Sequence, residues 1–437
     1  MTAYYIDAAE GSNSNSGLSP DNALKNDCGL AVKPGDIVLF RRGSFIRGRM
    51  NNVSGEEGSP ITYSAYGEGD APVFCGSADA ADEKLWTECG KNIWSCTPPV
   101  NDEVTNIVFD GGKSYGAFCW KLDDLKNQGD FYDECLGFKI KKKPIPENHK
   151  IYVYSEKNPA HFYKSIELCL FAERITANNG HDMIIENIKF LNCGVHVIAG
   201  EAQSRNLIIR NCIFENIGGG VWDDKNKIRY GNCVEFWDVG ENIEVTNCLF
   251  NNVYDSAVTH QGMEKCKCAE KLNFHHNVFI KCGMAAYEQR DRMPVNSCFN
   301  DNICVDAGEG FSKLGEEMPR YSEIWPQPMG HHIFLWRIEN ADSSCGLEIK
   351  NNIFYNSPYG AAVYSIIDEK AENSVDFDNN LYYNENGELL VRWHGENYKA
   401  FDECSYIDKN GRSEKIDIDA VVKKRIEEIT ESQKNKG

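Results

Sequence analysis

The chain has 437 residues, of which 41% are hydrophobic and 11% aromatic. It can therefore bury a large core and is not a disordered protein. Its 66 acidic and 46 basic residues give a net charge of −20 at pH 7, which disfavours nucleic acid or an anionic membrane surface as the main partner. A neutral sugar polymer or oligosaccharide fits this charge best, because a polyanionic glycan would need a local basic pocket.

No run of about 18 apolar residues occurs, so the sequence predicts no membrane span. The first residues, MTAYYIDAAEG, lack the charged segment and the apolar segment of a signal peptide. We therefore expect a cytoplasmic protein, or a secreted one from which a signal has been removed. Nothing in the sequence indicates an oligomeric state.

The 18 cysteines follow no CxxC…CxxC pattern, and Cys266 and Cys268 form a lone CxC pair. Cys193, Cys212 and Cys248 each follow a recurring phrase at a fixed place. A stacked column of buried thiols explains this placement better than disulfides or zinc does. Buried thiols in turn indicate a reducing compartment or an anaerobic source.

Residues 1–80 indicate a cap followed by the first coils of a repeat structure. The stretch KPGDIVLFRRGSFIRG predicts a turn, an apolar strand, a second turn and another strand, and SPITYSAYGEGDAPVFCG has the same style. Residues 81–170 break this pattern. Their segments TNIVFDGG and KIYVYSEKNPAHF are typical of short antiparallel strands and loops, which predicts a small β-rich insertion packed on the first coils.

From residue 180 a repeat is plain. One polar anchor recurs in MIIENIKF, LIIRNCIF, IEVTNCLF, LNFHHNVF, CFNDNICV, LEIKNNIF and VDFDNNLY, at Asn187, Asn211, Asn247, His276, Asp301, Asn351 and Asn379. Three residues later come Phe190, Phe214, Phe250, Phe279, Cys304, Phe354 and Tyr382. Coils stacked at about 4.8 Å would align these side chains in columns. The polar anchors would then hydrogen-bond from coil to coil, and the rings would stack inside.

The repeat units are short, β-branched and aromatic, and they contain neither an LxxLxL phrase nor a helical period. This pattern favours an all-β chain folded as a right-handed parallel β-helix over a leucine-rich or helical solenoid. Two long spacings between anchors indicate insertions, one between Gly218 and Tyr230 and one between Lys313 and Gly330. Such insertions tend to emerge on the binding face.

After residue 385 the repeat fades, and IDIDAVVKKRIEEITESQ predicts a C-terminal amphipathic helix. The chain therefore divides into a cap with first coils (1–80), a β-rich insertion (81–170), the main β-helix (171–385) and a C-terminal cap with a helix (386–437). We interpret this helix as a cover over the last coil.

The densest polar cluster lies between Tyr230 and Gly262. Aligning the strands NCVEFW (232–237), SAVTHQ (256–261) and AAYEQR (285–290) stacks Glu235, Thr259 and Glu288 in one column. Alternation places Val234, Phe236, Val258, His260, Tyr287 and Gln289 on one face. The other face then holds Glu235, Trp237, Thr259, Gln261, Glu288 and Arg290. This second set offers the hydrogen-bonding groups and the aromatic surface that a sugar ring needs.

Two coils separate Glu235 and Glu288, which predicts about 9.6 Å between their strands. Glycoside hydrolysis uses one carboxyl as an acid and a second as a base or nucleophile, about 5 to 9.5 Å apart. Asp255 opens the middle strand, and Asp223 and Asp224 lie on the neighbouring insertion. Crowded carboxyls raise the pKa of at least one of them, as a general acid requires.

The catalytic candidates are Glu235, Asp255 and Glu288, and the substrate-binding candidates are Trp237, His260, Gln261, Arg290 and Asp223. Some of these also have an ordinary structural explanation. His260 falls on the inward face, and both Asp223 and Asp255 have the position of a turn residue. We expect no metal, because the adjacent pair His331 and His332 would point to opposite faces of a strand.

Two other functions remain open. A polysaccharide lyase would need a base and a cation that neutralises a uronate, either Ca²⁺ or a basic residue such as Arg290, Arg292 or Lys313. The excess of carboxylates favours a hydrolase, which needs no cofactor. A glycan-binding or adhesive solenoid without catalysis would show aromatic and amide rows and would not need converging acids.

The opening YYIDAAEGSNSNSGLSPDNAL, then KPGDIVLFRRG and SPITYSAYGEG, resembles the start of pectate-lyase-like right-handed β-helix carbohydrate-active enzymes. RYGNCVEFWD and VYDSAVTHQG resemble phrases of glycoside hydrolase family 141. The resemblance covers most of residues 3–385 and implies a β-helix fold with α-L-fucosidase or xylanase activity. The chain departs from that pattern in its charged C-terminal helix, and a fold alone does not carry over a substrate.

Overall fold

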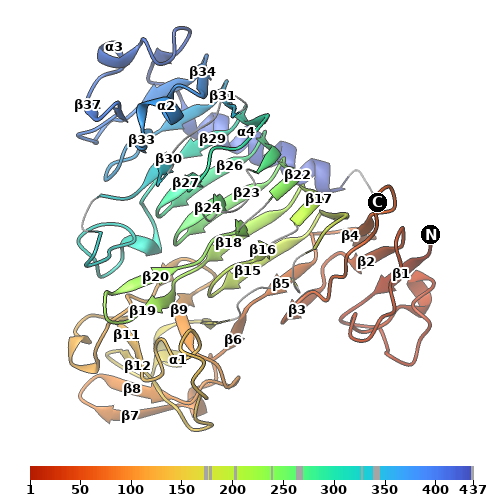
Figure 1. Ribbon diagram of the computed structural model, residues 1–437. Coiled ribbons are helices and arrows are strands. Elements are labelled where there is room, and N and C mark those ends of the chain that lie inside the picture. Colours follow the sequence, from red (N-terminus) through yellow and green to blue (C-terminus); the bar gives the residue numbers. More distant parts are fainter. Residues whose placement is uncertain are drawn as a thin grey trace.

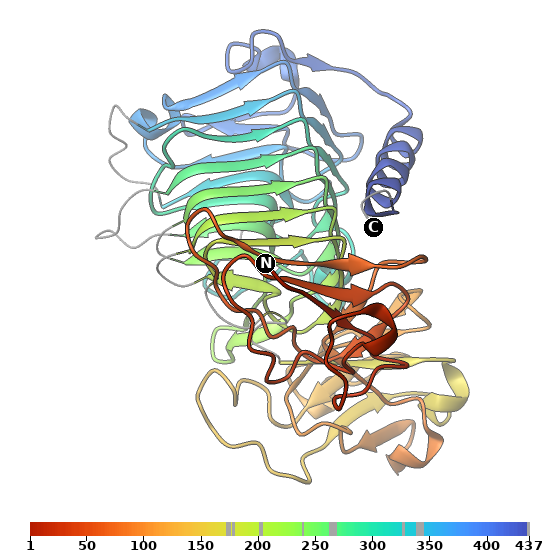
Figure 2. The ribbon, with the colours of Figure 1, turned by 90° about the vertical axis from the view of Figure 1, so that its right-hand side faces the viewer.

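The computed structural model describes residues 1–171, 176, 180–200, 204–237, 240–261, 269–325, 328–337 and 345–434. The chain winds into a solenoid whose coils add strands to three long parallel sheets (Figures 1 and 2). This confirms the predicted right-handed parallel β-helix.

The first sheet has the order β1 (Ala3–Ile6), β2 (Ile37–Arg41), β4 (Ile61–Tyr66), β14 (Met183–Glu186), β17 (Ser204–Arg210), β22 (Gly240–Thr246), β25 (Glu270–His275), β28 (Ser297–Asn300), β31 (Leu347–Lys350) and β34 (Val375–Asp378). The second has β3 (Phe45–Arg47), β5 (Val73–Cys75), β15 (Lys189–Cys193), β18 (Ile213–Ile217), β23 (Leu249–Val253), β26 (Val278–Cys282), β29 (Ile303–Val305), β32 (Ile353–Tyr355), β35 (Leu381–Tyr383) and β38 (Arg412–Ser413). The third has β16 (Ile198–Gly200), β21 (Val234–Trp237), β24 (Ser256–Gln261), β27 (Ala285–Arg290), β30 (His331–Trp336), β33 (Val363–Ile366), β36 (Val391–Trp393) and β37 (Glu396–Tyr398).

The turns between the first and second sheets explain the recurring polar anchor. Every anchor has a φ between +52° and +60°, the left-handed region that asparagine tolerates better than most residues because its short side chain hydrogen-bonds locally. Asn211 Nδ2 donates to Asn187 Oδ1 at 3.3 Å, and Asn247 Nδ2 donates to Asn211 Oδ1 at 2.6 Å. The predicted coil-to-coil bonds between anchors are confirmed here.

The predicted aromatic column is also confirmed. The rings of Phe190, Phe214, Phe250 and Phe279 stack in sequence, with centroids 5.2, 4.8 and 4.8 Å apart. These rings are fully buried in the core between the three sheets. Because each ring contacts the next coil, the column helps to fix the register of these four coils.

The cysteines that the structure describes form no disulfides. Cys212 and Cys248 share one column, in which Cys212 N donates to Cys248 Sγ at 3.4 Å, and amides continue that column from Asn277 onward. Cys193 is buried too, but it lies in another column and pairs with Ile217. Cys266 and Cys268 lie outside the described residues.

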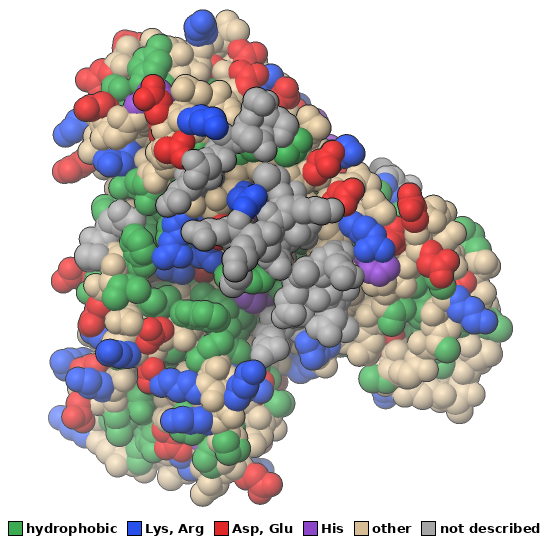
Figure 3. All heavy atoms as spheres, viewed as in Figure 1, with side chains coloured by type: hydrophobic (Ala, Val, Ile, Leu, Met, Phe, Trp, Pro, Cys, Tyr) green, Lys and Arg blue, Asp and Glu red, His purple; other side chains and the backbone are tan. Residues whose placement is uncertain are grey.

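An antiparallel unit leaves the solenoid after β5 and returns before β14. Its two sheets are built from β6 (Ser77–Asp79), β7 (Trp86–Gly90), β8 (Ile93–Cys96), β9 (Val104–Phe109), β10 (Ser114–Tyr115), β11 (Phe131–Asp133), β12 (Ile151–Tyr154) and β13 (Ile166–Leu170). Short helical segments join them at η2 (Glu83–Leu85), η3 (Leu122–Asp124) and α1 (Pro159–Phe162). Lys and Arg side chains gather over this unit at the lower left of Figure 3.

Two further excursions leave the second sheet and return at the third. The hairpin of β19 (Gly220–Asp223) and β20 (Ile228–Tyr230) follows β18, and a loop containing η4 (Phe311–Lys313) follows β29. The three excursions contact one another. Lys141 pairs with Asp224 at 2.5 Å, and Lys227 pairs with Glu323 at 2.8 Å. Together they form a wall beside the edge at which the strands of the third sheet begin.

Arg229 is the buried centre of this wall, with 2% of its surface exposed. Its Nη2 donates to the carbonyl of Thr105 at 2.8 Å and to Asn106 Oδ1 at 2.7 Å, and its Nε donates to the carbonyl of Gly219 at 2.7 Å. Its guanidinium stacks between the rings of Phe118 and Tyr254, at 4.1 and 4.5 Å. Arg229 therefore joins the antiparallel unit to the hairpin and to the coil that carries Asp255.

The C-terminal helix α4 (Ile418–Lys434) does not cover the last coil, which corrects our expectation. It runs along the outside of the second sheet (Figure 2). The reason is an outward-facing apolar column on that sheet, against which the helix packs: Ile213, Leu249, Val278, Ile303 and Ile353. The last coils are instead covered by shorter elements at β37, α2 (Glu369–Glu372) and α3 (Phe401–Cys404), where Phe401 stacks on Tyr382 at 4.9 Å.

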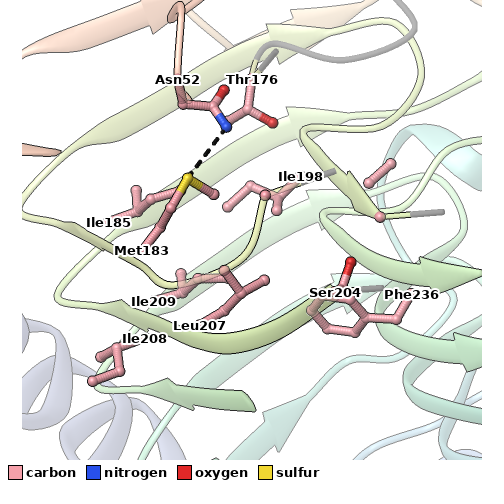
Figure 4. A pocket seen from close by; sticks show the side chains of 13 residues that line it. Asn52, Thr176, Met183, Ile185, Ile198, Ser204, Leu207, Ile208, Ile209 and Phe236 are labelled. Atoms are coloured by element: carbon pink, nitrogen blue, oxygen red, sulfur yellow. Dashed lines mark hydrogen bonds between the residues drawn. The ribbon is translucent and has the colours of Figure 1, made fainter. Parts of the chain in front are cut away.

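A hollow lies inside the coils that carry β14, β17 and β21, lined mainly by apolar side chains such as Met183, Ile198 and Phe236 (Figure 4). Asn52 Nδ2 donates to Met183 Sδ at 3.6 Å across it. This lining belongs to the core and offers too few polar groups to orient a sugar. Among the described helices, none is long and apolar enough to cross a membrane.

Glu103 supplies a pH test of the antiparallel unit. Burial raises its pKa to about 7, although the backbone N–H groups of Gly137 and Lys139 hydrogen-bond the carboxyl and oppose this shift. Because the folded pKa lies above the unfolded value, stability from this group is complete below pH 4.5 and is lost as the pH rises through 7. From pH 5 to pH 8 the wild type should lose about 2 to 3 kcal/mol relative to Glu103→Gln. Urea unfolding of both proteins at each pH measures this difference, and parallel pH profiles would contradict it.

Candidate active site

The third sheet brings the predicted carboxyl residues into register. Glu235 of β21 pairs with Thr259 of β24, which pairs with Glu288 of β27. Glu235 and Glu288 therefore occupy one column of the sheet, two coils apart, and the spacing of parallel strands places their backbones about 9.6 Å from each other. Both belong to the alternate set opposite Val234, Phe236 and Tyr287, which are buried in the main core.

Glu288 is held by three side-chain donors and is 2% exposed. Ser256 and Thr259 hydroxyls donate to its Oε2 at 3.0 Å each, and Trp336 Nε1 donates to its Oε1 at 2.6 Å. Burial raises the pKa of Glu288 above its ordinary value and the charge of Asp255 adds to the rise, against the lowering influence of Arg290 and Trp336. A carboxyl with a raised pKa can hold a proton near neutral pH.

Glu235 has the opposite character. Burial would raise its pKa, but His196, whose Nδ1 lies 2.7 Å from Glu235 Oε2, and a 3.0 Å hydrogen bond from Asn232 Nδ2 bring the net pKa below the ordinary value. Glu235 is 8% exposed. It is therefore an ionised carboxylate, held in place by two neighbours from the adjoining turn segments.

Asp255 immediately precedes β24 and pairs with Arg320, which comes from the loop after β29. Arg320 Nε donates to Asp255 Oδ1 at 3.0 Å, and Arg320 Nη2 donates to Asp255 Oδ2 at 3.4 Å. Both side chains are largely buried. This two-pronged ion pair links the wall of excursions to the carboxyl column.

A second column, two residues further along the same strands, contains Trp237, Gln261, Arg290 and Trp336. Arg290 Nη2 donates to Gln261 Oε1. The Arg290 guanidinium lies between two indole rings, 5.4 Å from the centre of Trp237 and 5.1 Å from that of Trp336. The structure thus brings three of the predicted sugar-binding residues together beside the carboxyl column.

Two predicted site residues do not join this cluster. His260 is 0% exposed and points into the core, where Gln289 Nε2 lies 3.0 Å from its Nδ1. Strand alternation places it on the face opposite Glu235 and Glu288, so its role as a substrate contact stays a prediction that this position does not support. Asp223 Oδ1 accepts from the backbone N–H groups of Lys225 and Asn226, so Asp223 is a turn residue of the β19–β20 hairpin.

His196, Arg320 and Trp336 contact the predicted carboxyls but were not among the sequence candidates. Trp336 was within reach, because HHIFLW (331–336) extends the alignment of the third-sheet strands by one coil. His196 gave a weaker signal, since Ala199 occupies the place of Glu235 in its coil. Arg320 lies in an insertion without a repeat, where spacing carries no information.

The arrangement offers one carboxyl with a raised pKa, one carboxylate with a lowered pKa and an adjoining column of aromatic and polar side chains. Pairs of titratable groups with opposite pKa shifts are characteristic of acid–base catalysis. Among the described residues, no three His, Cys, Asp or Glu side chains are grouped so that they could hold a metal ion.

A chain with such a stack of parallel sheets belongs structurally with β-helix proteins, and comparison with solved structures bears this out. XylC in complex with xylose has a TM-score of 0.53 at 12% identity, over 90% of this chain and 70% of that one. GH136 lacto-N-biosidase from Eubacterium ramulus also scores 0.53, at 15% identity, over 90% and 62%. A structure titled glycoside hydrolase scores 0.52 at 10% identity, over 97% and 98%. These likenesses show the fold.

Sequence comparison adds one short match. Residues spanning 16% of this chain are 35% identical, over 77 positions, to lacto-N-biosidase of Bifidobacterium longum subsp. longum, and they span 5% of that protein. No protein-family model matches the chain. The resemblance to β-helix carbohydrate-active enzymes is therefore confirmed as a likeness of fold, while membership of family 141 stays a prediction.

Proposed function

We propose that this protein is a glycoside hydrolase in which Glu288 is the general acid and Glu235 the general base. The observation that carries the proposal is a pair of carboxyls, two coils apart on one face, whose pKa values are shifted in opposite directions. Fold likeness to proteins titled glycoside hydrolase and lacto-N-biosidase supports it. Xylose in the XylC structure supports a sugar as the ligand class.

In this mechanism the protonated Glu288 donates its proton to the glycosidic oxygen as the bond to the anomeric carbon breaks. The ionised Glu235 removes a proton from a water molecule that attacks this carbon from the other side. The two strands lie about 9.6 Å apart, and inverting glycosidases hold their two carboxyl groups about 6.5 to 9.5 Å apart, so side chains that lean slightly toward each other would suit inversion. Asp255 contributes charge near Glu288 that favours its protonated form.

The second column would hold the sugar. Trp237 offers a flat apolar surface for the C–H face of a ring, and Gln261 offers an amide for a hydroxyl. Glu288 is 2% exposed, so this proposal requires the side chains around it to move before a substrate reaches the carboxyl. No cofactor takes part, and calcium belongs only to the lyase alternative.

A panel of aryl glycosides, oligosaccharides and polysaccharides tests this proposal. The expected result is a new reducing end without an unsaturated sugar, at the same rate with and without EDTA. Absorbance of an unsaturated uronate would replace the hydrolase with a lyase. A protein that binds glycans and releases no product would instead be a binding module.

The two limbs of the pH–rate profile report the two carboxyls separately. The Trp336 N–H stabilises the charged form of Glu288, so Trp336→Phe should raise the pKa of Glu288 further and move the alkaline limb to higher pH. His196 lowers the pKa of Glu235, so His196→Ala should move the acid limb to higher pH. The measurement is kcat/KM across pH for the wild type and both variants.

Each substitution serves as the control for the other, because each should move one limb only. If both variants move the same limb, or if neither limb moves while the rate falls, then Glu288 and Glu235 do not have the assigned roles.

A further inference from the structure

We infer that the glycan bound at this site carries a negative charge, a carboxylate or a sulfate, on a sugar unit next to the cleaved bond, and that Arg290 and Arg337 bind it. This inference rests on the proposed function, because it names the substrate class of the same site. It also departs from the overall charge of −20, which by itself favours a neutral glycan.

The two arginines alternate with three tryptophans. The guanidinium of Arg290 lies between Trp237 and Trp336, and that of Arg337 lies 4.8 Å from the ring centre of Trp336 and 5.6 Å from that of Trp325. Trp325 and Trp336 also meet edge to face, with centroids 5.6 Å apart. Stacked rings hold a guanidinium by its faces, which leaves its N–H edge directed at whatever lies in its plane.

Among the described residues, the N–H donors on these edges are only partly paired. Arg290 donates through Nη2 to Gln261, and its buried Nε, which has no hydrogen-bond acceptor among the described residues, forms an ion pair with Asp291 Oδ2 at 3.6 Å. Arg337 is exposed, and no carboxylate of the described residues lies within 4.0 Å of it. A planar fork of N–H donors of this kind matches the two oxygens of a carboxylate or sulfate.

The position of the column connects it to the proposed chemistry. Trp237, Arg290 and Trp336 follow Glu235, Glu288 and Phe334 by two residues on the same strands, so about 7 Å separates the two columns along the strands. The charge of Arg290 lowers the pKa of both Glu235 and Glu288. Arg290 is therefore close enough to act on both carboxyls, while Arg337 extends the positive surface beyond them.

The acidic surface elsewhere does not prevent this binding. At physiological salt, exposed charges more than about 8 Å apart are largely screened from one another. A bound anionic sugar therefore responds mainly to the groups in its immediate surroundings, which here include the two stacked guanidinium groups.

The test compares matched ligands in the Glu288→Gln background, in which binding is separated from turnover. The probes are galacturonate and glucuronate oligosaccharides and their carboxyl-reduced, neutral counterparts, measured by titration calorimetry. We expect the acidic forms to bind more tightly, and Arg337→Met to reduce this preference by about tenfold. Arg412→Met removes another exposed arginine, on β38 at the end of the second sheet, and should leave the preference unchanged.

Arg337 is exposed, so folding of its variant is checked simply by thermal unfolding. If the Glu288→Gln protein prefers the neutral forms, or if Arg337→Met and Arg412→Met behave alike in that background, the inference is overturned, while hydrolysis of neutral glycans by the wild type would still support the proposed function. If the wild type binds acidic glycans and cleaves them to an unsaturated product, the inference of an anionic substrate stands and the proposal of a hydrolase is contradicted. Failure of all glycans to bind removes both.

Discussion

Glu288→Gln is expected to lower kcat by roughly 10²- to 10⁴-fold, the usual contribution of a positioned general acid or base. Glutamine keeps an oxygen for Trp336 Nε1 and offers an amide to the hydroxyls of Ser256 and Thr259, which can rotate to accept from it. The hydrogen bonds around this side chain are thus retained, and thermal unfolding should stay close to that of the wild type. The fall in kcat would then be caused by the loss of proton transfer from Glu288.

The leaving group separates the two carboxyls. The dinitrophenolate of a dinitrophenyl glycoside leaves without being protonated, so Glu288→Gln should recover much of its activity on such a substrate. Glu235→Gln removes the base and should lose a similar factor on both kinds of substrate. Glu244→Gln, at a half-exposed position on the first sheet, is the control and should behave as the wild type. Equal losses of Glu288→Gln on both substrates would show that Glu288 is not the acid.

Arg229→Met is expected to destabilise the protein by about 3 to 5 kcal/mol. Methionine fills part of the space between Phe118 and Tyr254, but it leaves the carbonyls of Gly219 and Thr105 buried without their donor. Because Arg229 joins the antiparallel unit to the coil of Asp255, activity should also fall. Urea unfolding together with hydrogen exchange of residues 81–170 measures the effect.

Lys141→Met is the matched control. Lys141 and Asp224 join the same two parts of the molecule, but their side chains are 39% and 34% exposed. An exposed pair of this kind contributes less than about 1 kcal/mol. If both variants lose the same small amount, Arg229 does not hold these parts together.

The column of Glu235, Thr259 and Glu288 was predictable because two regularities fix it. The repeat sets which strands are neighbours, and alternation sets which side chains share a face. The same regularities placed His260 on the inward face, and the prediction that it contacts substrate went against that pattern. The anchors were predictable as a column, while their left-handed backbone explains why the position is held by Asn, His and Asp.

The partners of the carboxyls were less accessible. Arg320 reaches Asp255 across 65 residues of sequence, from a loop whose path depends on packing against the other excursions. The docking of α4 depends on outward residues such as Ile213 and Val278, which have the appearance of core residues until the inner and outer faces of the second sheet are known. The period of the sequence predicts the solenoid, but it does not predict which segments pack on the outside of the solenoid.

The helix α4 has a length that matches the array it covers. Its 17 residues span about 25 Å, which corresponds to about five coils at 4.8 Å each, and five coils supply its apolar seat, from Ile353 back to Ile213. At its far end Gln433 donates to the carbonyl of Asn211 and accepts from Arg42, a residue of the first coils. Ordinary solenoids can gain or lose a coil, since each coil meets only its neighbours. In this protein, an added coil would lengthen the stack by about 4.8 Å. The last turn of α4 would then no longer reach Asn211, so the helix constrains the number of coils that it spans.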